Sequence, residues 1–323
     1  MSNTTSTPMN RRRLLHRAAQ AAGLGIGMAT LPLARVFAED KATGTKKAAS
    51  FFKYAICSDA FCDWPLEKGF ALAAECGYQG IEIAPYNVAD NVTEISAARR
   101  REIRRQAESH HLEILGLHAL LVKTTKFFWT SPDAGVRRQT SAYFGELARF
   151  CSDLGGKLMV LGAPAKRNLA AGVSKEQGMQ NAADIITGAL PVLEKTGVAI
   201  ALEPLGPSET NFMNSAAEGA ELMRKVNSPY CRLHLDCKAM SEEATPIPDI
   251  IRKFQADFIH FHANDPNRLG PGFGKLDFTP ILKTLKEIDY RGWVSVEPVE
   301  YGPGPERLTR ESIAYLRRCE PQE

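Results

Sequence analysis

The sequence predicts an α/β protein that folds as a single (β/α)8 TIM barrel. Eight short apolar segments alternate with eight segments that repeat apolar residues at helical spacing, and six of the short segments carry a carboxylate or an imidazole near their C-terminal end. Alternation of this kind gives parallel strands with right-handed crossovers. The apolar segments are rich in β-branched residues, as expected for strands buried on both faces. Eight units favour a closed barrel, and the absence of a G-x-G-x-x-G after the first strand argues against a dinucleotide-binding fold.

Each element follows from its own local pattern. The segment 54–58 is the first apolar run short enough for a buried strand, and 66–76 has helical spacing and stops at Gly77. Ser174, with Gln177 three residues on, can begin a helix that ends near Gly197. The remaining strands are predicted at 80–84, 113–118, 157–161, 198–203, 231–236, 258–262 and 293–297. The remaining helices are predicted at 96–111, 139–154, 215–226, 247–255, 278–288 and 308–317.

The first 38 residues have the layout of a twin-arginine signal peptide. Arginines 11–13 precede a weakly apolar run, 18–33, and Val36-Phe37-Ala38 resembles a small-residue cleavage site. An amphipathic helix or a membrane anchor is the alternative, but the run is shorter than the ~20 residues of a membrane span. We therefore expect a signal at 1–38, a polar linker at 39–50 and the barrel at 51–323. The protein would be periplasmic or otherwise exported, with the twin-arginine export machinery as a partner and no stable membrane insertion after cleavage.

Composition excludes several other classes. The net charge is +3 at pH 7, so neither nucleic acid nor a membrane surface is an expected partner. The basic run 99–105 is interpreted as a solvated helix face, because acidic residues are interspersed with it. The seven cysteines are odd in number and contain no CxxC pair, and we interpret them as mostly free thiols.

The strand ends carry the candidate chemistry. Glu203, Asp236, His262 and Glu297 end the fifth to the eighth predicted strands, which are adjacent around one half of a barrel. Burying several carboxylates is feasible if a cation neutralises them. Three carboxylates and one imidazole suit Mn²⁺ best, with Co²⁺ or Mg²⁺ as alternatives, and suit structural zinc less well. Taken singly, Asp236 or Glu203 could cap a helix and His262 could be a core histidine, whereas four together predict one divalent-metal site.

The sequence resembles the xylose isomerase-like superfamily of sugar isomerases and epimerases, and within it the ketose 3-epimerases. The resemblance covers the mature chain and is carried by four segments: 202–209, continuing to 214–215, then 233–236, 260–274 and 293–297. The segment 129–133, with Val136 and Arg137 after it, is similar to the third loop of the family.

The resemblance implies roles for individual residues. It implies that Glu203, Asp236, His262 and Glu297 bind the metal ion, that Glu203 and Glu297 are also the catalytic acid/base pair, and that Glu209 and Arg268 contact substrate. The chain departs from the family at Ala239, where the epimerases usually have a substrate-binding histidine. Lys238 could supply a cation there or face solvent. His118 could contact substrate or lie behind the residues that do, and Glu82 is expected to orient its neighbours.

These observations predict a divalent-metal-dependent sugar isomerase or epimerase that abstracts a proton next to the carbonyl of a keto sugar and forms an enediolate. The alternative is a metal-dependent lyase or dehydratase on 3-keto-glycosides or keto-inositols, because the same enediolate can expel a leaving group. A non-catalytic sugar-binding barrel is more distant, and a DNA-repair endonuclease is disfavoured by the seven histidines and the modest charge. The resemblance also implies that the chain could form a homo-oligomer.

Overall fold

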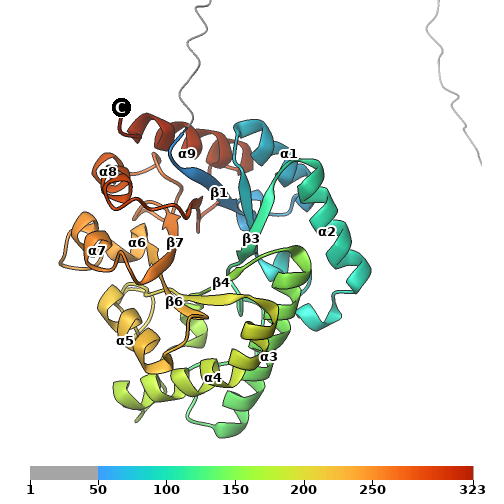
Figure 1. Cartoon of the computed structure of the whole chain (residues 1–323), viewed down its shortest axis with the longest axis vertical. Helices are drawn as coiled ribbons and strands as arrows, with labels where there is room; N and C mark the ends of the chain where they lie inside the picture. Colours follow the sequence, from blue (N-terminus) through green and yellow to red (C-terminus); the bar gives the residue numbers. More distant parts are fainter. Residues whose placement is uncertain (1–49, 323) are drawn as a thin grey trace, which may run out of the picture. The chain divides into compact units, whose positions relative to one another are not determined.

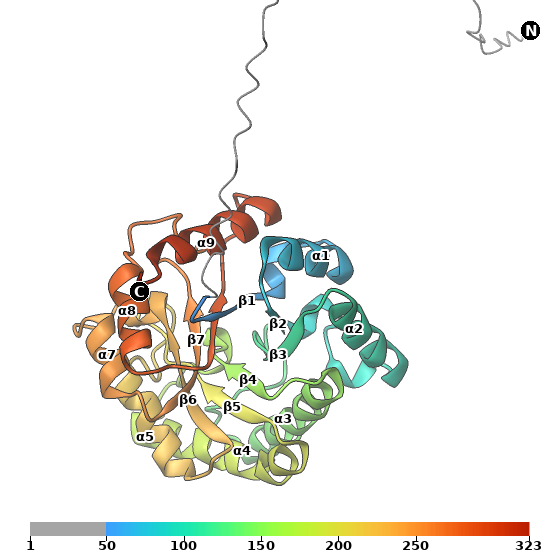
Figure 2. The ribbon, with the colours of Figure 1, turned by 45° about the horizontal axis from the view of Figure 1, so that its top comes forward.

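The computed structural model describes residues 50–322, and these residues form a closed barrel of eight parallel strands in the order β1 to β8 (Figure 1). Figure 2 shows the strands around the barrel axis with the helices outside them. The strands are β1 (Lys53–Cys57), β2 (Gly80–Ile83), β3 (Glu113–Leu117), β4 (Leu158–Leu161), β5 (Ala199–Leu202), β6 (Cys231–Asp236), β7 (Phe258–Ala263) and β8 (Trp293–Val296). The predicted fold class is confirmed.

The helices cover the outside of the barrel. They are α1 (Leu66–Cys76), α2 (Ala97–Ser109), α3 (Ala134–Leu154), α4 (Lys175–Thr196), α5 (Ala216–Val226), α6 (Cys237–Met240), α7 (Ile247–Lys253), α8 (Thr279–Glu287) and α9 (Pro305–Cys319). Four short 3-10 helices lie in the loops: η1 (Ser58–Phe61), η2 (Pro85–Asn87), η3 (Val92–Glu94) and η4 (Pro164–Lys166).

The helix ends follow from their capping residues. The Ser174 hydroxyl accepts a hydrogen bond from the Gln177 N–H at 3.2 Å, and Gly197 ends α4 in the left-handed conformation, as the sequence predicted. Helix α3 begins five residues earlier than predicted, because the Asp133 carboxylate accepts from the Val136 N–H at 2.8 Å. The four-residue helix α6 and the 3-10 turns were not predicted, since they are too short to show a period.

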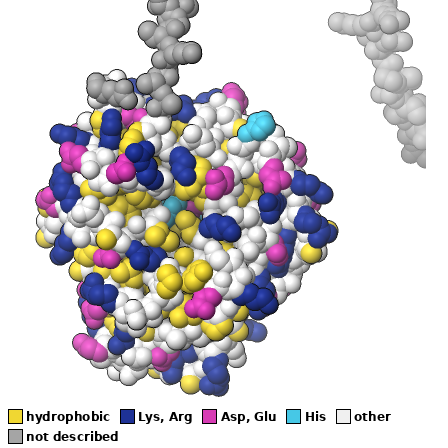
Figure 3. Space-filling view, viewed as in Figure 1, with side chains coloured by type: hydrophobic (Ala, Val, Ile, Leu, Met, Phe, Trp, Pro, Cys, Tyr) yellow, Lys and Arg dark blue, Asp and Glu magenta, His cyan; other side chains and the backbone are white. Residues whose placement is uncertain are grey.

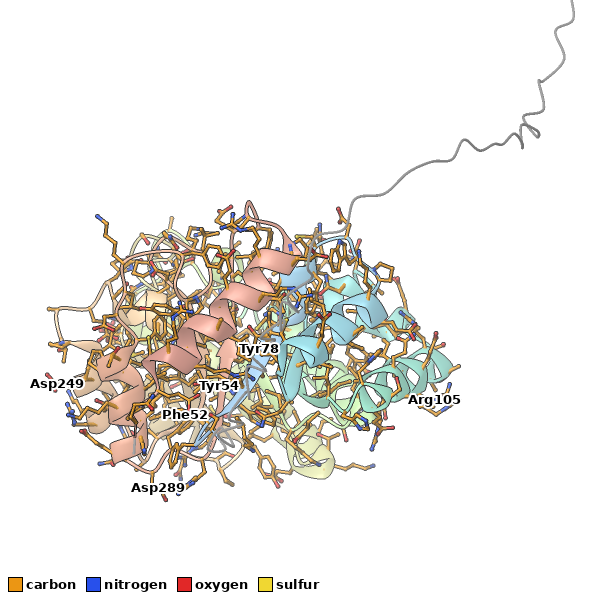
Figure 4. The ribbon with its side chains drawn as sticks, turned by 90° about the horizontal axis from the view of Figure 1, so that it is seen from above. Phe52, Tyr54, Tyr78, Arg105, Asp249 and Asp289 are labelled. Carbon is orange, nitrogen blue, oxygen red and sulfur yellow. The ribbon has the colours of Figure 1, made fainter. Side chains whose placement is uncertain are left out.

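The barrel closes between its first and last strands. Strand β1 pairs with β8 from Lys53↔Trp293 to Ile56↔Val296. Helix α9 packs over this seam: in Figure 4, Phe52, Tyr54 and Tyr78 lie inside the molecule beside it, whereas Arg105, Asp249 and Asp289 project from the surface. The Tyr78 hydroxyl donates to the Thr309 carbonyl at 3.0 Å and anchors α9.

Strand register decides which side chains meet inside the barrel. Asp236 of β6 is level with His262 of β7, and His262 is level with Ser295 of β8. Because alternate residues of a strand point to the same side, the side chains two positions earlier, His234 and His260, form the layer beneath. Both are fully buried.

Two predictions concern residues that the structure does not describe. The twin-arginine signal at 1–38 and nearly all of the linker at 39–50 lie outside the described residues. Within residues 50–322, no helix combines the length and the apolar character needed to cross a membrane.

Candidate active site

The four predicted metal ligands come together at the C-terminal mouth of the barrel. Glu203, Asp236 and His262, with His234 below them, offer ligand atoms that all lie within 4.8 Å of one another. Glu297 joins this cluster through His262, whose Nδ1 is 3.0 Å from Glu297 Oε2 and 4.0 Å from Glu203 Oε1. Side chains from four consecutive strands thus converge on one small volume.

Asp236 caps a helix, which is one of the two roles that the sequence left open for it. Its Oδ1 accepts from the Ala239 N–H at 2.7 Å and caps α6, while its Oδ2 accepts from the Asn264 amide at 2.6 Å. The same amide lies 3.3 Å from Glu297 Oε2, and the Asn264 Oδ1 accepts from the Lys238 N–H at 2.9 Å. Asn264 therefore fixes two carboxylates of the cluster relative to each other.

Glu82 fixes the ring of His262 from behind. His262 Nε2 lies 3.1 Å from Glu82 Oε1, and His260 Nε2 lies 2.8 Å from the same oxygen. A carboxylate acceptor places the proton of His262 on Nε2 and leaves Nδ1, which faces Glu203 and Glu297, free to bind a cation. Glu82 itself is fully buried at the end of β2, and it orients its neighbours as the sequence predicted.

The buried carboxylates shift one another's protonation. Burial, followed by the charges of Glu297 and Asp236, raises the pKa of Glu203 well above its usual value. Burial and the charge of Glu297 raise the pKa of Asp236 to about 6. Burial alone would also raise the pKa of Glu297, but His262 and His118 outweigh it and lower that pKa to about 2. Three carboxylates that are buried this close together repel one another when ionised, unless a cation lies between them.

These residues fit a divalent metal ion. The donor set is three carboxylates and one imidazole, and His262 Nδ1 is a buried atom without a hydrogen-bond partner. Carboxylate oxygens with one imidazole match the preferences of Mn²⁺ and Mg²⁺ better than those of a thiolate-rich zinc site. A divalent ion would offset the repulsion among the acids and would satisfy the unpaired imidazole nitrogen.

A cavity of about 260 Å³ opens above the cluster. Glu209, Lys238 and Arg268 line it together, and Glu209 pairs with both cations: with Lys238 Nζ in a close contact and with Arg268 Nη1 at 3.5 Å. The Lys238 side chain is only 8% exposed, so it points into the cavity and does not face solvent. The structure thus brings Glu209, Lys238 and Arg268 to the same cavity as Glu203, Asp236 and Glu297.

Arg268 is held by a strained loop. Its φ is +72°, a value that costs a non-glycine residue free energy and persists where the surroundings enforce it. Its N–H donates to the Asp265 carbonyl at 2.8 Å, and its own carbonyl accepts from the N–H groups of Val299 and Glu300. At Gly274, in the following turn, an added Cβ would overlap the Asp265 carboxylate. The glycine turn of the sequence lets this loop fold tightly beside the cavity.

His118 lies behind the cavity wall. It is fully buried, and its Nδ1 is 3.5 Å from Glu297 Oε1 while its Nε2 is 3.7 Å from Asp59 Oδ1. It is absent from the described residues that line the cavity. Of the two roles that the sequence left open, the geometry supports a residue that positions Glu297 and does not support direct substrate contact.

The aromatic loop after β3 packs against the barrel and does not cover the site. Trp129 is fully buried and meets the Phe212 ring edge-on at 5.7 Å, and Phe127 stacks on Tyr143 at 4.2 Å. Phe128 is 38% exposed, and none of these three aromatic residues lines the cavity. In the structure this loop is therefore packed on the barrel and is not a lid over the cavity.

A comparison with family models gives a match over residues 70–319 to the model described as xylose isomerase-like TIM barrel. The chain belongs to this family.

Individual relatives are similar at lower levels. The chain is 27% identical over 229 residues to a D-psicose 3-epimerase of Agrobacterium fabrum, covering 70% of this chain and 76% of that protein. It is 27% identical over 139 residues to a 3-dehydro-D-guloside 4-epimerase of Escherichia coli, covering 42% and 53%. Its fold is similar to that of a D-psicose 3-epimerase from Clostridium cellulolyticum H10, solved with D-tagatose, with a TM-score of 0.74 and 20% identity over 84% of this chain and 100% of that one.

Several residues of this xylose isomerase-like barrel that build the site were not predicted from the sequence. Asn264 and His234 could have been found, because each lies two residues from a predicted ligand on the same strand or its extension. Arg167 could not: it is a fully buried arginine from a loop, and it donates to the carbonyls of Gly162, Glu203 and Met213. Asp59 and Tyr301, which also line the cavity, lie in loops without any pattern.

The charges on the described surface are mixed in sign. On the face shown in Figure 3, Lys and Arg side chains are interspersed with Asp and Glu. The basic side chains of α2 pair with acids: Arg100 with Asp153 at 2.9 Å, and Arg104 with Glu108 at 2.8 Å. These pairs are what a solvated helix face of mixed charge would show.

Proposed function

We propose that the chain is a divalent-metal-dependent sugar isomerase or epimerase that acts on a keto sugar. The observation that carries the proposal is that Glu203, Asp236 and Glu297 line one cavity, and that His262 Nδ1 lies 4.0 Å from Glu203 Oε1 and 3.0 Å from Glu297 Oε2. The names of the relatives, which include ketose 3-epimerases and a 3-dehydro-D-guloside 4-epimerase, support the same class of reaction. On this proposal the chain is an enzyme of the isomerase class.

Four residues would hold the ion: Glu203, Asp236, His262 and Glu297. A divalent cation supplies electrostatic stabilisation of negative charge on a carbonyl oxygen, which makes the neighbouring carbon-bound proton more acidic. Mn²⁺ is the proposed metal, with Co²⁺ and Mg²⁺ as alternatives, because the donor set is rich in carboxylate oxygen. Glu82 would keep His262 in the tautomer that this requires.

Glu203 and Glu297 would remove a proton from the substrate and return one to it. They follow β5 and β8, which are separated in the barrel by β6 and β7, so they can approach the reacting carbon from different sides. One carboxylate removes the carbon-bound proton, and the electron pair moves to the carbonyl oxygen to give an enediolate. The other carboxyl group returns a proton from the opposite face, which inverts the centre.

Glu209, Lys238 and Arg268 would hold oxygen substituents of the sugar. Lys238 and Arg268 donate hydrogen bonds and Glu209 accepts them. Lys238 would then supply, next to Ala239, the polar group that the alanine side chain lacks. His118 would keep Glu297 in position from behind.

A lyase or dehydratase on 3-keto-glycosides or keto-inositols is the second candidate. It uses the same proton abstraction, but the electron pair of the enediolate expels a leaving group from the next carbon. Ala239 favours it, because a small side chain stands where ketose epimerases usually present a histidine to the sugar. The chain is also similar to a protein named 3-dehydro-D-guloside 4-epimerase, and this name indicates a keto-glycoside substrate for that relative.

Export of the folded protein and self-association remain part of the proposal. Residues 1–38 would direct the chain to the twin-arginine machinery, and the mature protein would act outside the cytoplasm. A homo-oligomer is proposed on the family resemblance alone.

The deciding experiment incubates the Mn²⁺-loaded mature protein with a panel of ketoses and 3-keto-glycosides and separates the products by chromatography. We expect a new epimer to form, the reaction to stop with a chelator, and Mn²⁺ or Co²⁺ to restore it. Release of an aglycone would identify the lyase instead. Turnover that persists in excess chelator would refute metal dependence, and no turnover with any substrate would favour a sugar-binding barrel.

A further inference from the structure

A second group of polar side chains lines the cavity, and the proposed reaction does not use it. Asp59 lies in η1 after β1, Tyr86 lies in η2 after β2, and Tyr301 follows β8. The Tyr301 hydroxyl donates to Asp59 Oδ2 at 3.1 Å, and the Tyr86 hydroxyl donates to the same oxygen at 3.4 Å. Three loops that are distant in sequence therefore build one cluster on the cavity wall.

The hydrogen bonds within this cluster determine which donors and acceptors remain for a ligand. A tyrosine hydroxyl has a single hydrogen to donate, and both hydroxyls give theirs to Asp59. Their oxygen atoms keep the capacity to accept. Asp59 is only 8% exposed, and its Oδ1 is a buried atom 3.7 Å from His118 Nε2, so the tyrosine oxygens are the acceptors that a ligand can reach. This wall of the cavity is thus short of donors and rich in acceptors.

The opposite wall of the cavity is rich in hydrogen-bond donors. Strands β1 and β2 lie across the closed barrel from β5 and β6, so Asp59 and Tyr86 face the side that carries Glu209 and Lys238. Lys238 supplies an ammonium donor there. The guanidinium of Arg268 is a second donor, and it belongs to the loop after β7, whose backbone pairs with Val299 and Glu300 next to Tyr301. The cluster of Glu203, Asp236, His262 and Glu297 lies between the two walls. A ligand with its carbonyl at that cluster can reach both walls.

We propose that Asp59, Tyr86 and Tyr301 form a hydroxyl-accepting subsite for the part of the sugar that does not react. Hydroxyl groups of a polyol chain or of a glycosidic ring supply the donors that this wall lacks, while oxygens near the carbonyl meet Lys238 and Arg268. The proposal rests on the proposed function, since it takes the position of the reacting carbon from it. The subsite would fix the orientation of the sugar in the cavity and would make the enzyme specific for sugars with hydroxyl groups at these positions.

The test removes one hydroxyl at a time from enzyme and substrate. Tyr86→Phe and Tyr301→Phe each delete a single oxygen and keep the ring, and Tyr230→Phe, just before β6 and outside the cavity, is the matched control. KM and kcat are measured with the best ketose, with its analogues that lack one hydroxyl beyond the reacting carbon, and with a 3-keto-glycoside. The melting temperature of each variant checks the fold.

Each cavity variant should raise KM for the complete sugar roughly 3- to 10-fold, the effect of one neutral hydrogen bond, and leave kcat within about twofold. With one of the deoxy analogues, wild type and variant should have the same KM, because the partner hydroxyl is already absent. A larger loss with the keto-glycoside than with the free ketose would assign the subsite to the glycosidic part, and equal losses would assign it to the carbon chain.

An unchanged KM, or a KM raised equally for every analogue, would overturn the subsite. If wild type turns over no sugar at all, the proposed function fails, and the subsite is then tested by binding alone. Calorimetric titration of the metal-loaded protein with the hexitol D-glucitol should show weaker binding by the two cavity variants than by wild type and Tyr230→Phe. Equal affinities, or no binding by wild type, would refute it.

Discussion

At the scale of single residues, Glu203 is the side chain on which the proposed site depends most. It is 6% exposed, it lies beside Asp236, His262 and Glu297, and its pKa is raised by burial and by the neighbouring acids. The backbone also makes room for it: a Cβ on Gly162, at the end of β4, would overlap Glu203 Oε2. A buried acid with these neighbours lowers the stability of the metal-free protein, and the same acid is needed once a cation is present.

Glu203→Gln should therefore separate stability from function. In the metal-free protein, loss of the repulsion should raise the melting temperature by ~2–4 °C, equivalent to on the order of 1 kcal/mol. In the metal-loaded protein, the loss of an acid/base group should lower kcat by ~10²–10⁴-fold. Calorimetric melting and the ketose assay measure the two effects, with the exposed Glu194→Gln as control. A variant that is less stable without metal, or fully active with it, would contradict this account.

The sequence predicted residues at strand ends better than residues in loops. Glu203, Asp236, His262 and Glu297 end buried strands, and the barrel places such ends together whatever lies between them. Lys238 was left open because the residue after a strand end can turn either way, and only the cap of α6 by Asp236 fixes its direction. Asp59, Tyr86 and Tyr301 reach the cavity from loops whose paths depend on tertiary packing, so no spacing in the sequence connects them.

At the scale of elements, β2 and β7 cooperate across the interior of the barrel although they are not neighbouring strands. Glu82, at the end of β2, accepts from both His260 and His262 of β7. The arrangement links the layer of buried histidines to the layer of candidate ligands above it. Strand ends and long helices were predicted closely because apolar periodicity sets them, whereas α6 and the path of the loop at 127–129 depend on contacts made by the folded chain.

Replacement of Glu82 by Gln should weaken metal binding while the fold persists. The amide has one acceptor oxygen in place of two and brings a donor toward two imidazole N–H groups, so the ring of His262 should be less well oriented. We expect the Kd for Mn²⁺ to rise roughly 10- to 100-fold, the usual effect of removing such a partner. Calorimetric titration measures it, and the exposed Glu113→Gln on β3 is the control. Equal affinities of Glu82→Gln and wild type would show that His262 does not need this carboxylate.

At the scale of the whole molecule, the barrel brings residues that are far apart in the sequence into one small site. Residues from 59 to 301 meet within one cavity because each strand ends at the same mouth of the barrel. Outside the site the same architecture supplies stability: apolar side chains fill the space between strands and helices, and a hydrogen bond from Tyr78 holds α9 against the beginning of the barrel. The candidate site thus occupies the C-terminal ends of the strands, and the surrounding apolar core supplies stability.

The most direct test of the shared metal site is a titration of the metal-free mature protein with Mn²⁺, followed by calorimetry and by the electron paramagnetic resonance of the free ion. Wild type should bind one Mn²⁺ per chain, and Asp236→Ala and His262→Ala, each of which removes one ligand, should bind it far more weakly while keeping their fold. Glu113→Gln should bind as wild type does. No uptake of Mn²⁺, Co²⁺ or Mg²⁺ by wild type, or unchanged affinity in both ligand variants, would contradict the convergence of these four side chains on a single ion.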